Sequence, residues 1–218
     1  MASRPGTADA YAPGAASVRP WPLERVACLC GAPAARPLFV KHGHRVVRCR
    51  SCGLAYVDPR PPRHDLLAIY REQTYYRNAN ACAYGYGDYV ADHRLLEPLA
   101  ARRLADIETR RPERGRLLDV GCATGVLLDV ARAGGWDVTG VDVSDYAVDF
   151  CRSRGLTVHH GDVESARFPS AHFDVVVMDD TVEHLADPRA TLAELARLLV
   201  PGGLVTTTRQ TKLASFAA

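Results

Sequence analysis

From residue 116 onwards, short apolar runs alternate with amphipathic segments. Residues 116–120, 136–144, 156–164, 173–180 and 204–209 have the composition of strands, and the run at 173–180 is apolar enough to be buried on both faces. Residues 126–135, 145–154 and 189–199 place apolar side chains at helical spacing. Strands that alternate with helices predict an α/β fold, in which a doubly wound, mainly parallel sheet carries helices on both faces.

Three segments precede this core, which we place at residues 115–218. Residues 1–24 are rich in Ala, Pro, Gly and Ser and are expected to form a disordered leader. Residues 25–60 contain a short alternating hairpin between two Cys-Gly turns, and residues 61–114 form a helical connector with an aromatic loop. In that loop Tyr75 and Tyr76 could cover a ligand, although such aromatic side chains more often pack into a core.

The length and charge of the chain exclude some classes of protein. Its 218 residues suffice for one medium domain with a small appendage. The 27 Lys and Arg and 25 Asp and Glu give a net charge of +2, which favours neither nucleic acid nor a membrane surface as a partner. No apolar run approaches the ~20 residues of a membrane span. The first residues lack the apolar middle of a secretory signal, so a cytoplasmic location with reduced cysteines is expected.

The cysteines are unevenly distributed. Four of the seven lie within 25 residues: Cys28, Cys30, Cys49 and Cys52. Two Cys-Gly turns that flank a hairpin are typical of a zinc ribbon, which predicts a structural Zn²⁺ held by these thiolates. The second turn has the usual two-residue spacing, whereas the first has one residue between its cysteines. A ribbon that has lost its metal therefore stays open as an alternative, as do His42 and His44 as substitute ligands.

Acidic residues stand at the ends of four predicted strands: Asp119, Asp142, Asp162 and Asp179. Unpaired buried carboxylates are costly, so packing alone does not explain them. Parallel sheets bind ligands at the carboxyl ends of their strands, and Asp142 is placed there to accept hydrogen bonds from a ribose diol. The glycine loop after Asp119 lacks the second glycine of the pyrophosphate fingerprint, which favours a nucleoside ligand without phosphates.

Two segments carry a family resemblance. Residues 117–144, "LLDVGCATGVLLDVARAGGWDVTGVDVS", resemble the opening of the class I S-adenosylmethionine-dependent methyltransferases. Residues 173–205 are similar to the segment around the fourth and fifth strands of that family, and "CGLAYVDPRP" is similar to a subfamily with a zinc ribbon ahead of the catalytic domain. The resemblance implies a Rossmann-like fold that transfers a methyl group from S-adenosylmethionine to an O, N or C nucleophile of a small-molecule acceptor.

The resemblance also implies roles for individual residues. The loop under the methionine and ribose would consist of Asp119, Gly121, Cys122, Ala123 and Gly125. Ala123 stands where the family more often has glycine, which is tolerable at negative φ but strained at positive φ. The nucleoside would be bound by Asp142 at its ribose and by Val143, Asp162 and Val163 at its adenine.

Two further residues concern the reacting end of the ligand. Asp179 would lie near the methionine or the acceptor. His184 could deprotonate an acceptor hydroxyl, because an imidazole accepts protons near neutral pH, and a capping or orienting role is an equally open alternative.

The family sheet has seven strands, so this chain, with five predicted strands, is expected to be truncated after the fifth. An inactive remnant, or a cofactor- or protein-binding module, is the alternative function, and the oligomeric state is unknown.

Overall fold

The computed structural model describes residues 22–41, 43–71 and 93–208. The chain divides into two compact units, the first of which takes in the described residues up to Asp65 and the second those from Leu66 onwards. The predicted leader lies almost wholly outside the described residues, as do His42, Tyr75 and Tyr76. Among the described helices, none is both long and apolar enough to cross a membrane.

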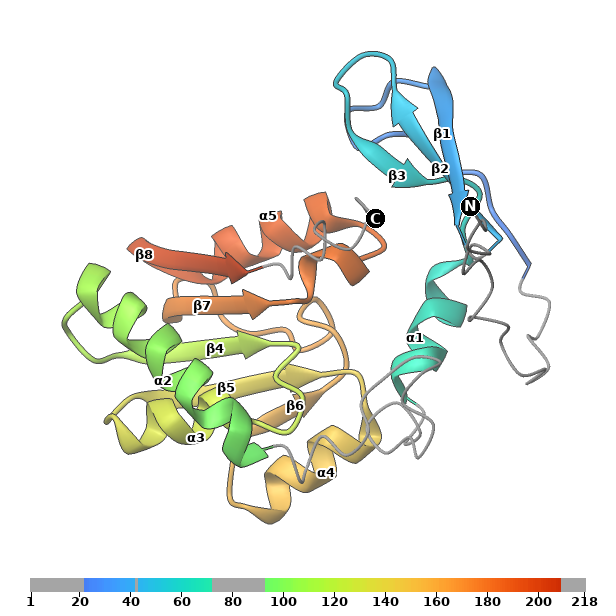
Figure 1. Cartoon of the computed structure of the whole chain (residues 1–218). Helices are drawn as coiled ribbons and strands as arrows, with labels where there is room; N and C mark the ends of the chain where they lie inside the picture. The colour runs from blue at the N-terminus through green and yellow to red at the C-terminus, as the bar shows by residue number, and fades with distance from the viewer. Residues whose placement is uncertain (1–21, 42, 72–92, 209–218) are drawn as a thin grey trace, which may run out of the picture. The chain divides into compact units, whose positions relative to one another are not determined.

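The first unit contains a three-stranded antiparallel sheet. Its strands are β1 (Ala35–Lys41), β2 (His44–Cys49) and β3 (Ala55–Val57), in the order β1-β2-β3 (Figure 1). The predicted hairpin is therefore confirmed. The Asp58 carboxylate accepts hydrogen bonds from the Val26 N–H at 3.0 Å and the Arg25 side chain at 3.0 Å, which ties the segment before β1 to the end of β3.

The second unit holds the α/β core. Its elements are α1 (Arg63–Arg71, which begins in the first unit), α2 (His93–Arg110), β4 (Arg116–Val120), α3 (Val126–Ala133), β5 (Asp137–Asp142), α4 (Asp145–Ser153), β6 (Val158–His160), β7 (Phe173–Asp179), the 3₁₀ turn η2 (Val182–His184), α5 (Pro188–Leu198) and β8 (Leu199–Thr208). Side chains cap two of these helices: Ser144 Oγ accepts from the Ala147 N–H at 3.3 Å, and Asp187 Oδ1 accepts from the Ala190 N–H at 3.0 Å.

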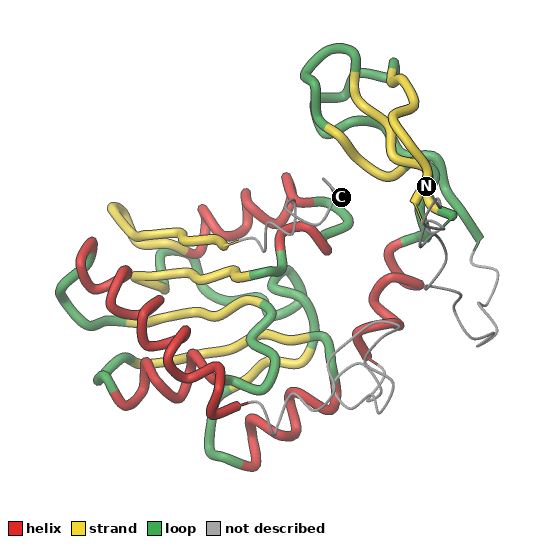
Figure 2. The backbone as a smooth tube through the Cα atoms, in the orientation of Figure 1, coloured by secondary structure: helices red, strands yellow, loops and turns green. Residues whose placement is uncertain are grey.

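The five strands of the core form one parallel sheet in the order β6-β5-β4-β7-β8 (Figures 1 and 2). The chain runs outward from β4 through β5 to β6, and then crosses back to β7 on the other side of β4. The loops after β4 and β7 therefore leave in opposite directions. Doubly wound sheets bind ligands beside such a reversal, which makes the carboxyl ends of β4, β5 and β7 the candidate binding edge.

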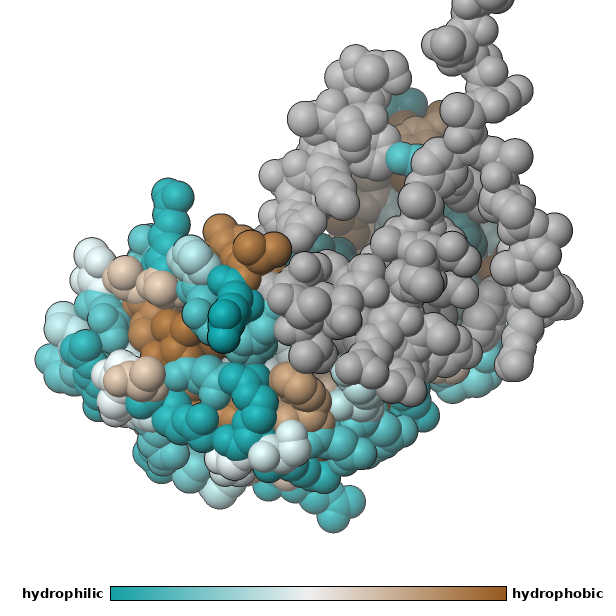
Figure 3. Space-filling view, turned by 60° about the horizontal axis from the view of Figure 1, so that its bottom comes forward, coloured by the Kyte–Doolittle hydropathy of each residue, from teal (hydrophilic) through white to brown (hydrophobic). Residues whose placement is uncertain are grey.

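Both faces of the sheet are covered, as the sequence predicted. Val175 and Val177 of β7 join one buried cluster with Ile107 of α2, whereas Met178 joins a second buried cluster with Leu195 of α5. Figure 1 shows α2 and α3 on one side of the sheet and α5 on the other. On the face drawn in Figure 3, the coloured residues are mainly hydrophilic, with scattered apolar patches. The fold is therefore a Rossmann-like α/β sandwich.

One boundary differs from the sequence prediction. Residues 201–203, "PGG", were expected to separate the last helix from a strand beginning at residue 204. In the structure β8 starts at Leu199, immediately after α5. Phe173 pairs with Leu199 and Val175 with Leu204, so the extra residues are accommodated as an irregularity in the pairing of β7 with β8, where Gly202 has φ 75°.

Candidate cofactor and active site

The loop that joins β4 to α3 is held closely on two sides. The Gly121 and Cys122 N–H groups both donate to the Val141 carbonyl of β5, at 2.8 and 3.2 Å. A Cβ on Gly121 would lie 2.4 Å from Thr181 Oγ1, which belongs to the segment after β7. Gly121 also has φ 79°, so both the space and the backbone conformation require glycine. The loop thus touches β5 and the segment after β7, the two neighbours of β4's carboxyl end.

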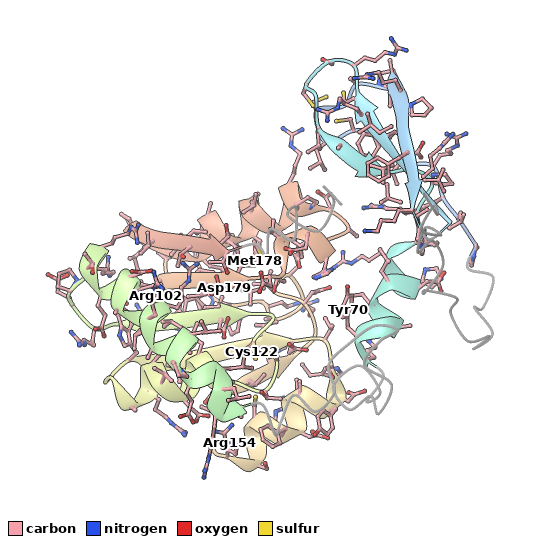
Figure 4. All side chains as sticks on the ribbon, viewed as in Figure 1. Tyr70, Arg102, Cys122, Arg154, Met178 and Asp179 are labelled. Atoms are coloured by element: carbon pink, nitrogen blue, oxygen red, sulfur yellow. The ribbon has the colours of Figure 1, made fainter. Side chains whose placement is uncertain are left out.

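Ala123 lies in this loop with φ 47°, in the left-handed region. The sequence left the sign of φ open, and the structure shows the strained case, which costs about 1–2 kcal/mol for a residue with a Cβ. Two contacts hold the residue there. Its N–H donates to Asp142 Oδ2 at 2.8 Å, and its carbonyl accepts from the Cys151 thiol at 3.3 Å. Cys122 is buried beside it (Figure 4).

Asp142 ends β5 and is 6% exposed. Burial raises the pKa of its carboxyl, while hydrogen bonds from the N–H groups of Ser144, Ala123 and Val143 oppose that rise. A carboxylate offers about four acceptor positions, so about one position is left for a ligand hydroxyl. The Val143 carbonyl is itself 3.2 Å from His160 Nε2, a contact that the sequence did not suggest.

Asp119 occupies the corresponding position on β4. It is 6% exposed, and burial raises the pKa of its carboxyl to about 8, with further increases from the Asp179 and Asp142 carboxylates that the Arg103 guanidinium partly offsets. The side chain is therefore largely protonated at neutral pH. A cationic group placed beside Asp119 would favour its ionised form, so this acid fits a ligand that carries a positive charge.

Asp179 ends β7 (Figure 4) and forms a two-pronged ion pair with Arg103 of α2. Arg103 Nε lies 3.0 Å from Asp179 Oδ2 and Nη2 lies 2.7 Å from Oδ1, which also accepts from the Thr208 N–H at 3.0 Å. Arg103 was not predicted from the sequence. The feature that could have indicated it is its place on an amphipathic helix, next to the buried Leu104 and near the buried Ile107.

Asp162 and Val163 follow β6. Asp162 Oδ1 accepts from the Ser165 N–H at 2.8 Å and so closes a turn. Val163 is 1% exposed and packs in the cluster that contains Val141. Its side chain is therefore part of the core, and only its backbone could meet an adenine.

His184 lies in η2, shortly after β7. The turn that leads to it contains Asp180 at φ 47°, a left-handed residue whose N–H donates to the Thr208 carbonyl at 3.0 Å. Strained residues of this kind often occur at functional sites. His184 Nδ1 lies 2.8 Å from the hydroxyl of Tyr70 on α1.

The four cysteines of the first unit converge. Their sulfur atoms all lie within 4.8 Å of one another, so the short spacing of the first turn does not keep them apart. The N–H of Cys30 bonds to Cys28 Sγ, and those of Cys52 and Ser51 bond to Cys49 Sγ. The Cys52 N–H is the largest of the influences that lower the pKa of Cys49 to about 6. At Cys28 the Cys30 N–H also lowers the pKa, but burial and the hydrogen bonds to Cys52, Cys30 and Cys49 outweigh it and raise the pKa to about 12. The four sulfur atoms therefore lie close enough to share protons, and such a set of thiols suits a four-sulfur metal site once it is deprotonated.

The family follows from a match to known sequences. Residues 91–215, more than half of the chain, match the family described as a methyltransferase domain, and the chain belongs to this family. One similar protein is a ubiquinone biosynthesis O-methyltransferase of Thiobacillus denitrificans, 34% identical over 131 residues that cover 56% of each chain. Another is a malonyl-(acyl-carrier protein) O-methyltransferase of Serratia marcescens, 33% identical over 58% of this chain and 50% of the relative. The chain spans about half the length of the curated relatives it matches.

A solved structure supports the fold. A Methanococcus maripaludis protein with a provisional assignment as an S-adenosyl-L-methionine-dependent methyltransferase matches with a TM-score of 0.50 and 19% identity, covering 54% of this chain and 58% of that one. At this level of identity the likeness concerns the fold alone. It agrees with the parallel sheet of the second unit.

Proposed function

We propose that the second unit binds S-adenosylmethionine at the carboxyl edge of its sheet and transfers the methyl group to an O, N or C nucleophile of a small-molecule acceptor. One observation carries the proposal. The Ala123 N–H bonds to the Asp142 carboxylate, so the glycine loop after β4 and the acid that ends β5 form one rigid cradle. Membership of the methyltransferase domain family and the names of the two curated relatives support methyl transfer, with oxygen as the favoured nucleophile.

The residues at this edge fit the ligand's chemistry. Asp142 has about one acceptor position left for a ribose hydroxyl, and Val143 and Asp162 are placed for the adenine. Asp119, whose burial holds it largely protonated, would ionise against the ligand's ammonium group. Asp179 is already neutralised by Arg103. When bound, S-adenosylmethionine supplies an electrophilic methyl group, and His184 is the candidate to accept a proton from the acceptor.

Calorimetry tests this proposal. Titration of S-adenosylmethionine into the full chain should show one binding site, and Asp142→Asn should weaken binding by at least about tenfold, since a hydrogen bond to a charged group contributes about 1.5–3 kcal/mol. Asp137→Asn, at the other end of β5, is the matched control and should leave affinity unchanged. Failure of the folded wild-type chain to bind would reject the proposal. Binding without turnover of any acceptor would favour the alternative of a binding module.

The first unit carries a second candidate function. We propose that its four cysteines hold one structural Zn²⁺, because four thiolates in a tetrahedral set are the usual donors of such sites. The convergence of all four sulfur atoms supports this. The described His44 lies outside the four-sulfur cluster, so it is not needed as a substitute ligand. Elemental analysis should find about one zinc per chain, since structural sites hold their metal tightly, and less than about a tenth would reject the site.

We further propose that the segments have separate roles: 25–60 as the zinc ribbon, 61–114 as a connector and 115–218 as the cofactor-binding core. The division of the chain after Asp65 supports the first boundary to within a few residues. Separate expression of residues 22–65 with zinc would test it. A folded, metal-bound ribbon is expected, and an unfolded peptide in the presence of zinc would count against an independent unit.

A further inference from the structure

The Tyr70–His184 contact joins residues 114 positions apart in the sequence. The Tyr70 hydroxyl lies 2.8 Å from His184 Nδ1, and the two rings are 5.3 Å apart at an angle of 58°. Tyr70, labelled in Figure 4, is on α1, whereas His184 is on the 3₁₀ turn after β7. In the described part of the chain, nothing hydrogen-bonds to the other ring nitrogen, Nε2.

The pair lies on a segment that touches the proposed cofactor loop. The His184 N–H donates to the Thr181 carbonyl at 3.0 Å, and Thr181 Oγ1 donates to the Asp179 carbonyl at 2.8 Å. A Cβ on Gly121 would come within 2.4 Å of Thr181 Oγ1, so this short turn rests directly on the glycine loop. The imidazole is therefore carried by the same edge of the sheet as the cradle.

Other acids at this edge are poorly suited to accept a proton. Asp179 is engaged by Arg103 and by the Thr208 N–H. Asp142 is engaged by three backbone N–H groups. Asp119 is 6% exposed, and in the proposed function its carboxylate faces the ligand's ammonium group. His184, with Nε2 unengaged, is the better proton acceptor among them.

The direction of the Tyr70–His184 hydrogen bond decides which ring nitrogen of His184 carries the proton. Burial, with the Glu183 carboxylate, raises the pKa of Tyr70 above its ordinary value, so the hydroxyl is neutral at physiological pH. A neutral hydroxyl can either donate to Nδ1 or accept from it. If it donates, Nε2 carries the ring proton and cannot act as a base. If it accepts, Nδ1 carries the proton and Nε2 presents a lone pair.

We propose that Tyr70 is a positioning residue that accepts the Nδ1–H of His184 and thereby holds Nε2 ready to take a proton from an acceptor hydroxyl. This inference rests on the proposed function and narrows the acceptor to an ionisable hydroxyl, such as a phenol or enol. The proton passes from the acceptor oxygen to Nε2, and the electron pair of the broken O–H bond stays on the oxygen as the nucleophile. A neutral amine already has a lone pair and needs no base before it attacks.

Nuclear magnetic resonance of the full chain with ¹⁵N-labelled histidine tests the tautomer directly. The His184 signal is identified by its loss in His184→Gln. In the wild type the ring proton should lie on Nδ1, and in Tyr70→Phe it should move to Nε2. A wild-type ring with its proton on Nε2, or a tautomer unchanged in folded Tyr70→Phe, would overturn the proposal. Tyr56→Phe in the first unit is the matched control and should have no effect.

A second measurement tests the acceptor class. The chain is saturated with S-adenosylhomocysteine, and 4-nitrocatechol is added as a probe whose phenolate absorbs visible light. Bound probe should ionise at least about one pH unit below the free probe, and the shift should vanish in His184→Gln, because the base that takes the proton is lost. A bound but neutral probe, or no binding of the probe at millimolar concentration, would count against a hydroxyl acceptor.

The two proposals fail differently. Tyr70→Phe should leave the affinity for S-adenosylmethionine within about twofold of wild type, since it changes only the hydroxyl that contacts His184. Loss of cofactor binding in the wild type would defeat the proposed function whatever the tautomer. Normal cofactor binding with the wrong tautomer would defeat only the role of Tyr70.

Discussion

The N–H of Ala123 donates to Asp142 Oδ2 at 2.8 Å, so a residue in the left-handed conformation and an acid on the neighbouring strand are joined by one hydrogen bond. The bond helps to hold Ala123 in a conformation that it would otherwise avoid. It also fixes the direction of the Asp142 carboxylate, which keeps one of its acceptor positions for a ligand. Changes at either residue should therefore affect both the stability of the loop and the affinity for the cofactor.

Ala123→Gly should stabilise the protein. Glycine adopts φ 47° without the steric penalty of a Cβ, which is about 1–2 kcal/mol, although part of this gain is lost to the greater freedom of glycine in the unfolded chain. We expect a net increase of about 0.5–1 kcal/mol in the free energy of unfolding. Urea unfolding followed by circular dichroism measures it.

Ala105→Gly on the exposed face of α2 is the control for this change. Ala105 is exposed and helical, so glycine there should destabilise the protein by up to about 1 kcal/mol. The two Ala→Gly changes thus have opposite expected signs. Equal destabilisation by both would show that Ala123 is not strained in solution.

Asp119 should make the protein less stable as the pH rises from about 4 to 8. The folded-state pKa of about 8 lies above the unfolded value, so over this interval the unfolded chain has released a proton that the folded chain keeps. The stabilisation is complete below pH 4 and is lost as the pH approaches 8, with a slope of at most about 1.4 kcal/mol per pH unit. Asp142, whose pKa burial also raises, contributes in the same direction.

Asp119→Asn isolates this contribution. The amide cannot ionise, so the variant should lose most of the decline in unfolding free energy between pH 5 and 7.5. Denaturant unfolding at four pH values in that range provides the comparison, with Asp137→Asn, an exposed acid on β5, as the control that should keep the wild-type slope. A wild-type slope in Asp119→Asn would mean that Asp119 is ionised in the folded state.

The regular elements were predictable because their determinants are local. The run "RLLDV" gave the bounds of β4, Arg116–Val120, since a strand buried on both faces is apolar throughout. The starts of α4 and α5 are also locally determined, because the Ser144 and Asp187 side chains accept hydrogen bonds from N–H groups within the next three residues. The acids at the strand ends were found in the same way, by their position after apolar runs.

The features that could not be predicted from the sequence depend on contacts between residues that are far apart along the chain. The positive φ of Ala123 goes with hydrogen bonds from its N–H to Asp142 and from the Cys151 thiol to its carbonyl, and no neighbour in the sequence reveals these contacts. Arg103 and Asp179 are 76 positions apart, and the sequence of neither element indicates that the other is its partner. The family resemblance implied Val163 at the adenine, and the burial of its side chain in the core leaves only its backbone for that role.

Replacing one of the four clustered cysteines should remove the zinc from the first unit. Cys49→Ser should lower the zinc content from about one equivalent to less than about a tenth, because a hydroxyl does not replace a thiolate in a structural site. Ser51→Ala is the matched control, since the serine lies between the two cysteines of the turn and contributes its backbone N–H, which alanine keeps. Inductively coupled plasma mass spectrometry on dialysed protein measures both, and equal zinc in the two variants would exclude Cys49 as a ligand.

Arg103→Met should destabilise the protein by about 1–3 kcal/mol, because it leaves the Asp179 carboxylate without its charged partner. Asp179→Asn removes that carboxylate, so Arg103→Met should cost less in its background, with a coupling of about 0.5–3 kcal/mol. Arg102→Met, at the exposed neighbouring residue (Figure 4), is the control and should be nearly neutral.

Arg103 also offsets part of the rise in the pKa of Asp119, so its loss should shift the pH-dependent decline in stability to higher pH. If the effects of the two single changes on the unfolding free energy are additive, and the pH range of the decline in stability is unchanged, Arg103 lies away from both Asp179 and Asp119 in solution.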